Sequence, residues 1–177
     1  MNDFIERKGD VTFKGQPLTA AGPVLKVGEK APEFAAVNNA LEEETLSTTH
    51  GKIRLIASVP SLDTPVCDIE IRRFNKEVTS FSRNVEVITI SMDLPFAQKR
   101  WCAAAGVERV RTLSDHRQAS FGKNWGVLVK ELRLLQRAVF VVDENDILRY
   151  IEYVREIGEE PDYAAALNAV KSLTSEQ

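Results

Sequence analysis

The chain has few cysteines and histidines, the residues that form disulfides and often bind metal ions. Its 177 residues include two cysteines and two histidines. Two cysteines are too few for the disulfide-dense style of small secreted domains, and a chain of this length can bury a full core without such staples. The histidines, His50 and His116, have no zinc-ligand spacing with the cysteines. We therefore expect no metal.

Long apolar runs and an excess of one charge are also missing. No apolar run approaches the roughly 18–20 residues of a transmembrane helix, and the charged start MNDFIERKGD lacks the apolar centre of a signal peptide. The 23 basic and 26 acidic residues leave a net charge of −3, which gives no electrostatic reason for a nucleic-acid or membrane partner. We expect a cytoplasmic protein, in which a cysteine pair is more often catalytic, redox-active or metal-binding than structural.

Without a repeat or linker, the sequence predicts one domain over residues 1–177. The hydrophobic patterns and turn residues predict, in chain order, a hairpin over 11–20, a short strand near 34–37, a strand over 52–59, a helix over 67–81, a strand over 85–93, a helix over 95–107, a short helix or irregular connection within 114–126, a hairpin over 137–154 and a helix over 160–173. The strand–helix–strand part implies a parallel central pair with helices on both faces. This order is typical of an α/β, thioredoxin-like fold with a central mixed sheet, here with an added N-terminal hairpin.

Cys67 stands at a strand-to-helix junction, within PSLDTPVCDIE at residues 60–70. Pro65 has a backbone φ that suits the start of a helix, and a helix starting near Val66 puts Cys67 in its first turn. Unpaired N–H groups and the helix dipole there favour a thiolate, which is the reactive form of cysteine. Thr64 could donate its hydroxyl to the sulfur or to a substrate oxygen. The alternative is a buried structural cysteine, with Thr64 only capping the helix.

Cys102 lies far along the chain, in the helix expected over 95–107. The wide separation from Cys67 does not fit a CxxC redox motif or a metal site. A disulfide between the two cysteines requires Cα atoms within about 7 Å. Because Cys102 falls about two turns into its helix, pairing is expected to need local unwinding. The alternative is a small core residue within WCAAAG.

Arg137 opens the apolar run RAVFVV. An arginine at the start of a strand is commonly a solvated edge charge. If the topology brings Arg137 near Cys67, it could stabilise a thiolate and orient a negatively charged oxygen. The sequence does not decide between these two interpretations.

The segment PSLDTPVCDIEIRRFN resembles the active-site segment of the peroxiredoxins, whose pattern is Pro-x-x-x-Thr/Ser-x-x-Cys, and Pro60, Thr64 and Cys67 fit that spacing. SMDLPFAQKRWC resembles the resolving-cysteine segment of their thiol peroxidase subfamily. QRAVFVVDENDIL and EPDYAAAL resemble its C-terminal region, and VTFKGQPL its N-terminal hairpin. The resemblance covers nearly the whole chain. Two residues depart from the familiar pattern: Pro65 replaces a small residue, and Trp101 replaces phenylalanine.

The resemblance implies an atypical two-cysteine peroxidase. Cys67 matches the peroxidatic cysteine, which a peroxide oxidises to a sulfenic acid. Cys102 matches the resolving cysteine, which forms an intramolecular disulfide with Cys67. Thr64 and Arg137 match the residues that bind the peroxide and stabilise the thiolate and the transition state, and Pro60 the residue that shapes the pocket. The resemblance also implies thioredoxin as reductant, a homodimer, a preference for alkyl hydroperoxides and no cofactor.

Two other classes of function use the same cysteines. A thiol–disulfide exchanger would need no peroxide, although the missing CxxC motif argues against it. A peroxide sensor or binding module would oxidise in the same way, but would turn over slowly and signal through a partner. Oxidation by one equivalent of peroxide distinguishes a peroxidase or a sensor from a thiol–disulfide exchanger. Turnover with thioredoxin then distinguishes a peroxidase from a sensor.

Overall fold

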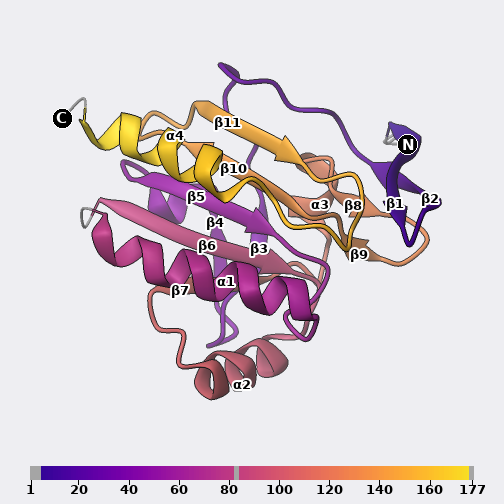
Figure 1. Cartoon of the computed structure of the whole chain (residues 1–177), viewed down its shortest axis with the longest axis horizontal. Helices are drawn as coiled ribbons and strands as arrows, with labels where there is room; N and C mark the ends of the chain where they lie inside the picture. Colours follow the sequence, from indigo (N-terminus) through magenta and orange to yellow (C-terminus); the bar gives the residue numbers. More distant parts are fainter. Residues whose placement is uncertain (1–4, 82–83, 176–177) are drawn as a thin grey trace.

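The computed structural model describes residues 5–81 and 84–175. Within them, the larger sheet has the strand order β11-β10-β5-β6-β7-β3-β4 (Figure 1). Its strands, in chain order, are β3 (Ala35–Val37), β4 (Glu43–Thr45), β5 (Ile53–Ser58), β6 (Val85–Ser91), β7 (Val110–Ser114), β10 (Ala138–Val142) and β11 (Leu148–Tyr153). β5, β6 and β7 are parallel, whereas β10, β11, β3 and β4 join antiparallel. The prediction of a central mixed sheet is confirmed.

The helices lie against this sheet and at its edge (Figure 1). They are α1 (Pro65–Glu77), α2 (Pro95–Ala105), α3 (Ser120–Asn124) and α4 (Tyr163–Ser175), with short 3-10 turns at η1 (Leu46–Thr49) and η2 (Val78–Ser80). α1 and α4 contribute to a core cluster on one face, and α3 to a cluster on the other. None of the helices in the described ranges is long and apolar enough to cross a membrane.

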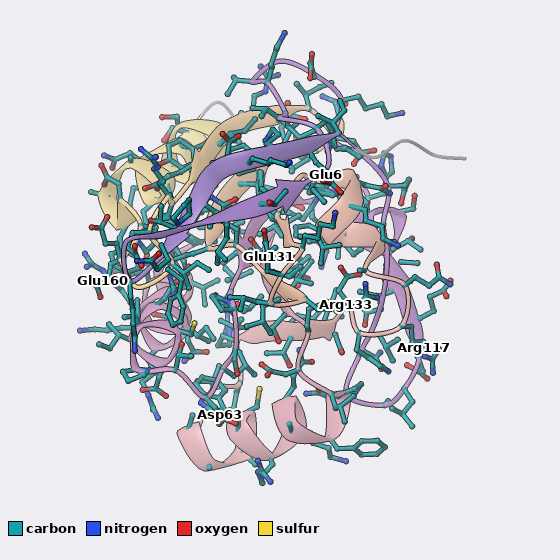
Figure 2. All side chains as sticks on the ribbon, turned by 90° about the vertical axis from the view of Figure 1, so that its right-hand side faces the viewer. Glu6, Asp63, Arg117, Glu131, Arg133 and Glu160 are labelled. Carbon is teal, nitrogen blue, oxygen red and sulfur yellow. The ribbon has the colours of Figure 1, made fainter. Side chains whose placement is uncertain are left out.

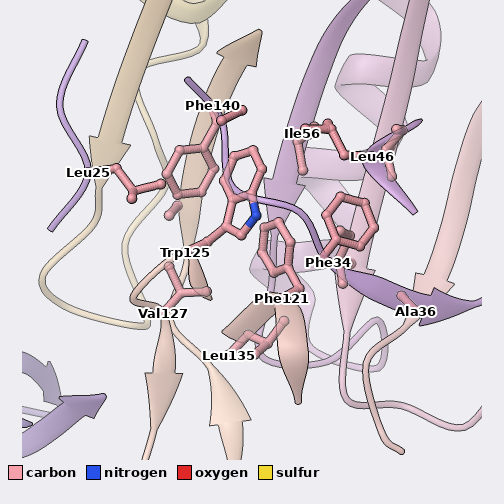
Figure 3. Close-up of a cluster of buried hydrophobic side chains, with 14 of the residues drawn as sticks. Leu25, Phe34, Ala36, Leu46, Ile56, Phe121, Trp125, Val127, Leu135 and Phe140 are labelled. Carbon is pink, nitrogen blue, oxygen red and sulfur yellow. The ribbon is translucent and has the colours of Figure 1, made fainter. Parts of the chain in front are cut away.

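Successive residues of the central strands belong alternately to the two clusters, because side chains of a strand point to opposite faces in turn. In β5, Ile56 belongs to the cluster beside α3, while Leu55 and Ala57 belong to the one beside α1 and α4. All six residues of β5 are buried, including Arg54 and Ser58, as expected for a strand that is covered on both faces. Figure 3 shows the α3 side, where Phe121 and Phe140 pack around Trp125. Cys67 belongs to the opposite cluster.

The N-terminal hairpin belongs to a separate, smaller sheet. Its strands are β1 (Glu6–Phe13), β2 (Gln16–Ala21), β8 (Leu128–Val129) and β9 (Leu134–Leu135), in the order β1-β2-β8-β9. The two turn residues, Lys14 and Gly15, have φ of 50° and 77°, which is the positive-φ pair of a tight hairpin turn. The predicted hairpin is confirmed. β8 and β9 were not predicted, because two-residue strands carry no periodicity.

Three further elements differ from the prediction. The sequence predicted no strand at β4, which lies between the strands predicted near 34–37 and over 52–59. The sequence predicted no strand at 110–114, where β7 pairs in parallel with β6. The stretch VRTLS is short, and its strand conformation depends on this pairing. The last helix begins at Tyr163, after Pro161 and Asp162 rather than around them. Asp162 instead accepts a hydrogen bond from the N–H of Ala165, in the manner of an N-cap residue.

Candidate active site

Cys67 is fixed in the first turn of α1. Thr64 is the N-cap residue and Pro65 is the first helical residue, where the missing proline N–H leaves no gap in the helix. Cys67 is therefore the third residue of the helix, close to the N–H groups that have no helical acceptor. Its exposed fraction is 0%. The predicted position in the first helical turn is confirmed.

Arg137 contacts the sulfur of Cys67 directly. Its Nη2 lies 3.2 Å from Cys67 Sγ, and the same nitrogen donates to the carbonyl oxygen of Ile157 at 3.2 Å. A third bond runs from Arg137 Nε to that carbonyl at 3.4 Å. Arg137 is 1% exposed. The interpretation of Arg137 as a solvated edge charge is wrong, because the pairing of β10 with β5 carries it into the interior beside α1.

Glu70 completes a buried group of three ionisable side chains. It is fully buried and forms an ion pair with Nη1 of Arg137. Sequence reasoning missed it, although its position three residues after Cys67 places both on one helix face. Burial raises the pKa of Glu70 to about 7, against the opposing effect of Arg137. Burial tends to lower the pKa of Arg137, but Glu70 and Cys67 outweigh it, and the net direction is upward.

This group holds one permanent cation between two acids. The carboxyl of Glu70 and the thiol of Cys67 both contact Arg137, and all three side chains are almost completely removed from water. A buried cation balances one anion well, whereas a second anion adds an uncompensated charge. The arrangement can therefore stabilise a thiolate on Cys67, most strongly when Glu70 is protonated.

A cavity of about 290 Å³ opens beside Arg137. Its lining consists of Phe13, Pro60, Thr64, Pro65, Val66, Arg137, Ile157 and Gly158. Arg137 is the one charged residue of this lining, and Pro60 is buried. The hydroxyl of Thr64 donates to the carbonyl oxygen of Ser61 at 3.1 Å, and no cap bond from it to the helix forms. Thus Pro60, Thr64 and Arg137 meet in one cavity, and Phe13 joins them from the distant hairpin.

Cys102 lies in a different environment. It is partly exposed on α2, and its Sγ is 3.6 Å from Oγ1 of Thr112. It lines an open cavity of about 370 Å³ that shares no lining residue with the cavity at Arg137. Both cysteines are free thiols. Across residues 5–81 and 84–175, no group of three or more His, Cys, Asp or Glu side chains is arranged to hold a metal ion.

The two cysteine-bearing helices nevertheless meet at the loop before α1. Asp63 and Thr64 of this loop line a cavity of about 300 Å³ together with Trp101 of α2, and Figure 2 shows Asp63 next to that helix. Asp93, just before α2, accepts hydrogen bonds from Ser61 Oγ and the Leu62 N–H, both at 2.8 Å. These hydrogen bonds join the segment before α2 to the loop that carries Thr64.

Comparison with known proteins identifies the family of this chain. The model of the AhpC/TSA family matches residues 27–151. A thiol peroxidase from Oceanobacillus iheyensis is 56% identical over 159 residues, covering 90% of this chain and 96% of that protein. A thiol peroxidase from Bacillus subtilis is 51% identical over 164 residues, covering 93% and 98%.

Solved structures show the same fold. A peroxiredoxin-like protein from Aquifex aeolicus superimposes with a TM-score of 0.86 at 40% identity, covering 96% of this chain and 98% of that one. A thiol peroxidase from Chromobacterium violaceum reaches 0.85 at 20% identity, which bears on the fold alone. The predicted peroxiredoxin-type, thioredoxin-like fold is confirmed. This chain belongs to the AhpC/TSA family, among the thiol peroxidases.

Proposed function

We propose that this thiol-dependent peroxidase reduces hydroperoxides through two cysteines. The Cys67 thiolate attacks the terminal oxygen of the peroxide, the O–O bond breaks, and the departing oxygen takes a proton to leave as alcohol or water. Cys67 then carries a sulfenic acid. The Cys102 thiol condenses with it, forming the Cys67–Cys102 disulfide and releasing water.

The observation that carries this proposal is the buried bond from Arg137 to the Cys67 sulfur beside a cavity. A guanidinium fixed in a water-poor site stabilises the thiolate and the negative charge that develops on the peroxide oxygen. Thr64 supplies a hydroxyl to the same cavity, where it binds the peroxide, and Pro60 shapes the wall. We assign no cofactor or metal to this chemistry.

The cavity supports organic hydroperoxides as substrates, alongside hydrogen peroxide. Apart from Thr64 and Arg137, the side chains of its lining are apolar, and they come from Phe13, Pro60, Pro65, Val66 and Ile157. An apolar wall contributes binding energy for an alkyl or aryl group and none for the small polar peroxide. Pro65, which departs from the family pattern, is part of this wall.

The partner that we propose for the disulfide is thioredoxin. A dithiol reductant must reach one sulfur of the disulfide, and Cys102 is partly exposed in the reduced protein whereas Cys67 is not. The resemblance to thiol peroxidases further supports a homodimer, and the small number of cysteines supports a reducing, cytoplasmic location. The whole chain, residues 1–177, acts as one domain in this proposal.

A peroxide titration followed by mass spectrometry tests the mechanism. One equivalent of peroxide should convert the reduced protein to the Cys67–Cys102 disulfide. Cys67→Ser should abolish peroxide consumption, while Cys102→Ser should allow one oxidation and lose cycling with thioredoxin. Full turnover by Cys67→Ser would refute the mechanism. Inertness to peroxide would favour a thiol–disulfide exchanger, and rapid oxidation without thioredoxin-supported turnover would favour a sensor.

A further inference from the structure

Residues 155–158 lie between the N-terminal hairpin and the cysteine site. On one side, the N–H of Thr12 donates to the carbonyl oxygen of Arg155 at 2.7 Å, and the N–H of Ile157 donates to that of Thr12 at 2.9 Å. On the other side, the carbonyl oxygen of Ile157 accepts the bonds from Arg137. The hairpin thus contacts Ile157, whose carbonyl oxygen orients Arg137, although more than a hundred residues separate Thr12 from Ile157 in sequence.

The Glu156 carboxylate holds the tip of the hairpin. It accepts hydrogen bonds from Thr12 Oγ1 at 2.8 Å and from the N–H groups of Lys14 and Gly15 at 2.9 and 3.1 Å. The bonds from Thr12, Gly15 and Lys14 lower the pKa of Glu156. Glu156 is therefore ionised at neutral pH, and a charged acceptor makes the stronger hydrogen bonds.

This contact fixes the residues on both sides of Phe13. Thr12 and Lys14 each donate to Glu156, while Phe13 itself is 40% exposed and receives limited support from packing. Phe13 nevertheless lines the cavity at Arg137, as do Ile157 and Gly158, the two residues after Glu156. The position of the Phe13 ring over the cavity depends on how the hairpin tip is held.

We propose that Glu156 is a positioning residue, which holds Phe13 as a wall of the cavity and thereby sets the preference for bulky organic hydroperoxides over hydrogen peroxide. The inference rests on the proposed function. The backbone bonds between Thr12 and Ile157 do not involve the Glu156 side chain, so its loss leaves the contact of Ile157 with Arg137 in place. Small peroxides, which do not need an apolar wall, are affected less.

Stopped-flow oxidation of the full chain by cumene hydroperoxide and by hydrogen peroxide tests this inference. Glu156→Ala should slow oxidation by cumene hydroperoxide about tenfold and by hydrogen peroxide less than about threefold, since a lost apolar contact changes discrimination by roughly this amount. Phe13→Ala should have the same effect, and the double variant should be no slower than Phe13→Ala alone. Equal losses for both peroxides, or additive losses in the double variant, would overturn the proposal.

Two further variants separate positioning from folding and from failure of the proposed function. Glu159→Ala, at an exposed position three residues after Glu156, is the matched control and should keep the wild-type ratio of the two rates. Glu156→Gln retains an acceptor oxygen and should recover much of the cumene hydroperoxide rate. Amide exchange of Lys14 and Gly15 should accelerate in Glu156→Ala; unchanged exchange would overturn the proposal. If the wild type reacts with neither peroxide, the proposed function fails first.

Discussion

The two cysteines occupy opposite extremes of packing in one molecule. Cys67 is fully buried in a helix whose inner face also buries Glu70, Ile71 and Phe74. In α2, by contrast, the buried residues are Pro95 and Gln98, while Cys102 is partly exposed. One cysteine is held by a charged side chain in the interior, and the other has a weak contact with a threonine hydroxyl.

In the proposed mechanism, the two helices have separate tasks that fit this difference in packing. A reacting sulfur benefits from fixed partners that need no rearrangement during the reaction, which the surroundings of Cys67 provide. A resolving sulfur must travel, and local opening costs least where little apolar area is buried. We therefore expect α2 to open more readily than α1 during disulfide formation.

Replacement of Arg137 should disturb the rigid surroundings of Cys67 most strongly. Arg137→Lys keeps the positive charge but loses the planar fork that reaches Cys67, Glu70 and Ile157 together. Oxidation of Cys67 by peroxide should slow by about 10²–10³-fold, the usual cost of losing one preorganised donor. Stopped-flow fluorescence measures this rate. Arg133→Lys, on an exposed turn, is the control, and a loss below about fivefold in Arg137→Lys would contradict the assigned role.

Glu70→Gln should change the pH dependence of stability. Because burial raises the pKa of Glu70 from 4.5 to about 7, the folded state holds its proton more tightly than the unfolded state. The free energy of unfolding should therefore fall as pH rises from about 4.5 to 7, by on the order of 3 kcal/mol from this group. Glu70→Gln should lose this part of the slope.

Urea unfolding at pH 5 and pH 8 measures the effect. Asp115, whose pKa burial raises to about 6, contributes in the same direction in both proteins, so the slope should become shallower and not vanish. Asp115→Asn provides the matched comparison on the opposite side of the sheet. Identical slopes for wild type and Glu70→Gln would show that Glu70 stays ionised beside Arg137 throughout this range.

Much of this arrangement was predictable from sequence, for identifiable reasons. The β-branched and aliphatic residues of the buried strands β5 and β6 and the Lys14–Gly15 turn carry strong local signals, and the position of Cys67 follows from Pro65. The two-residue strands and β7 carry weak local signals, since their conformation depends on pairing with distant segments.

Single residues around Cys67 and the cavity were hard to predict for the same reason. In the sequence, Glu70 is one of several charged residues of a helix. Its burial depends on an ion pair with Arg137, which comes from another part of the chain. Phe13 and Glu156 meet the site only because the hairpin folds across residues 155–158. Such contacts join segments that no local pattern connects.

A weaker effect is expected from a substitution in α2, where Pro95 and Gln98 are the buried residues. Gln98, buried in α2, donates through Nε2 to Ser91 Oγ at 3.0 Å and to the carbonyl oxygen of Leu113 at 2.9 Å. Gln98→Leu removes both bonds while keeping a side chain of similar size, which should weaken the docking of α2 by about 1–3 kcal/mol. Amide exchange in α2 should accelerate, and so should formation of the Cys67–Cys102 disulfide after oxidation of Cys67.

Quenched mass spectrometry of the oxidised protein follows that second step, and Gln118→Leu, at an exposed position, serves as control. An increase of a few-fold in disulfide formation, with an unchanged rate of the first oxidation, would place the barrier in the opening of α2. If disulfide formation kept its wild-type rate while α2 exchanged faster, the slow movement would instead lie in α1, whose first turn must release Cys67 from Arg137. The packing difference between the helices argues for the first outcome, because opening α1 separates Glu70 from the buried Arg137 and also exposes apolar side chains.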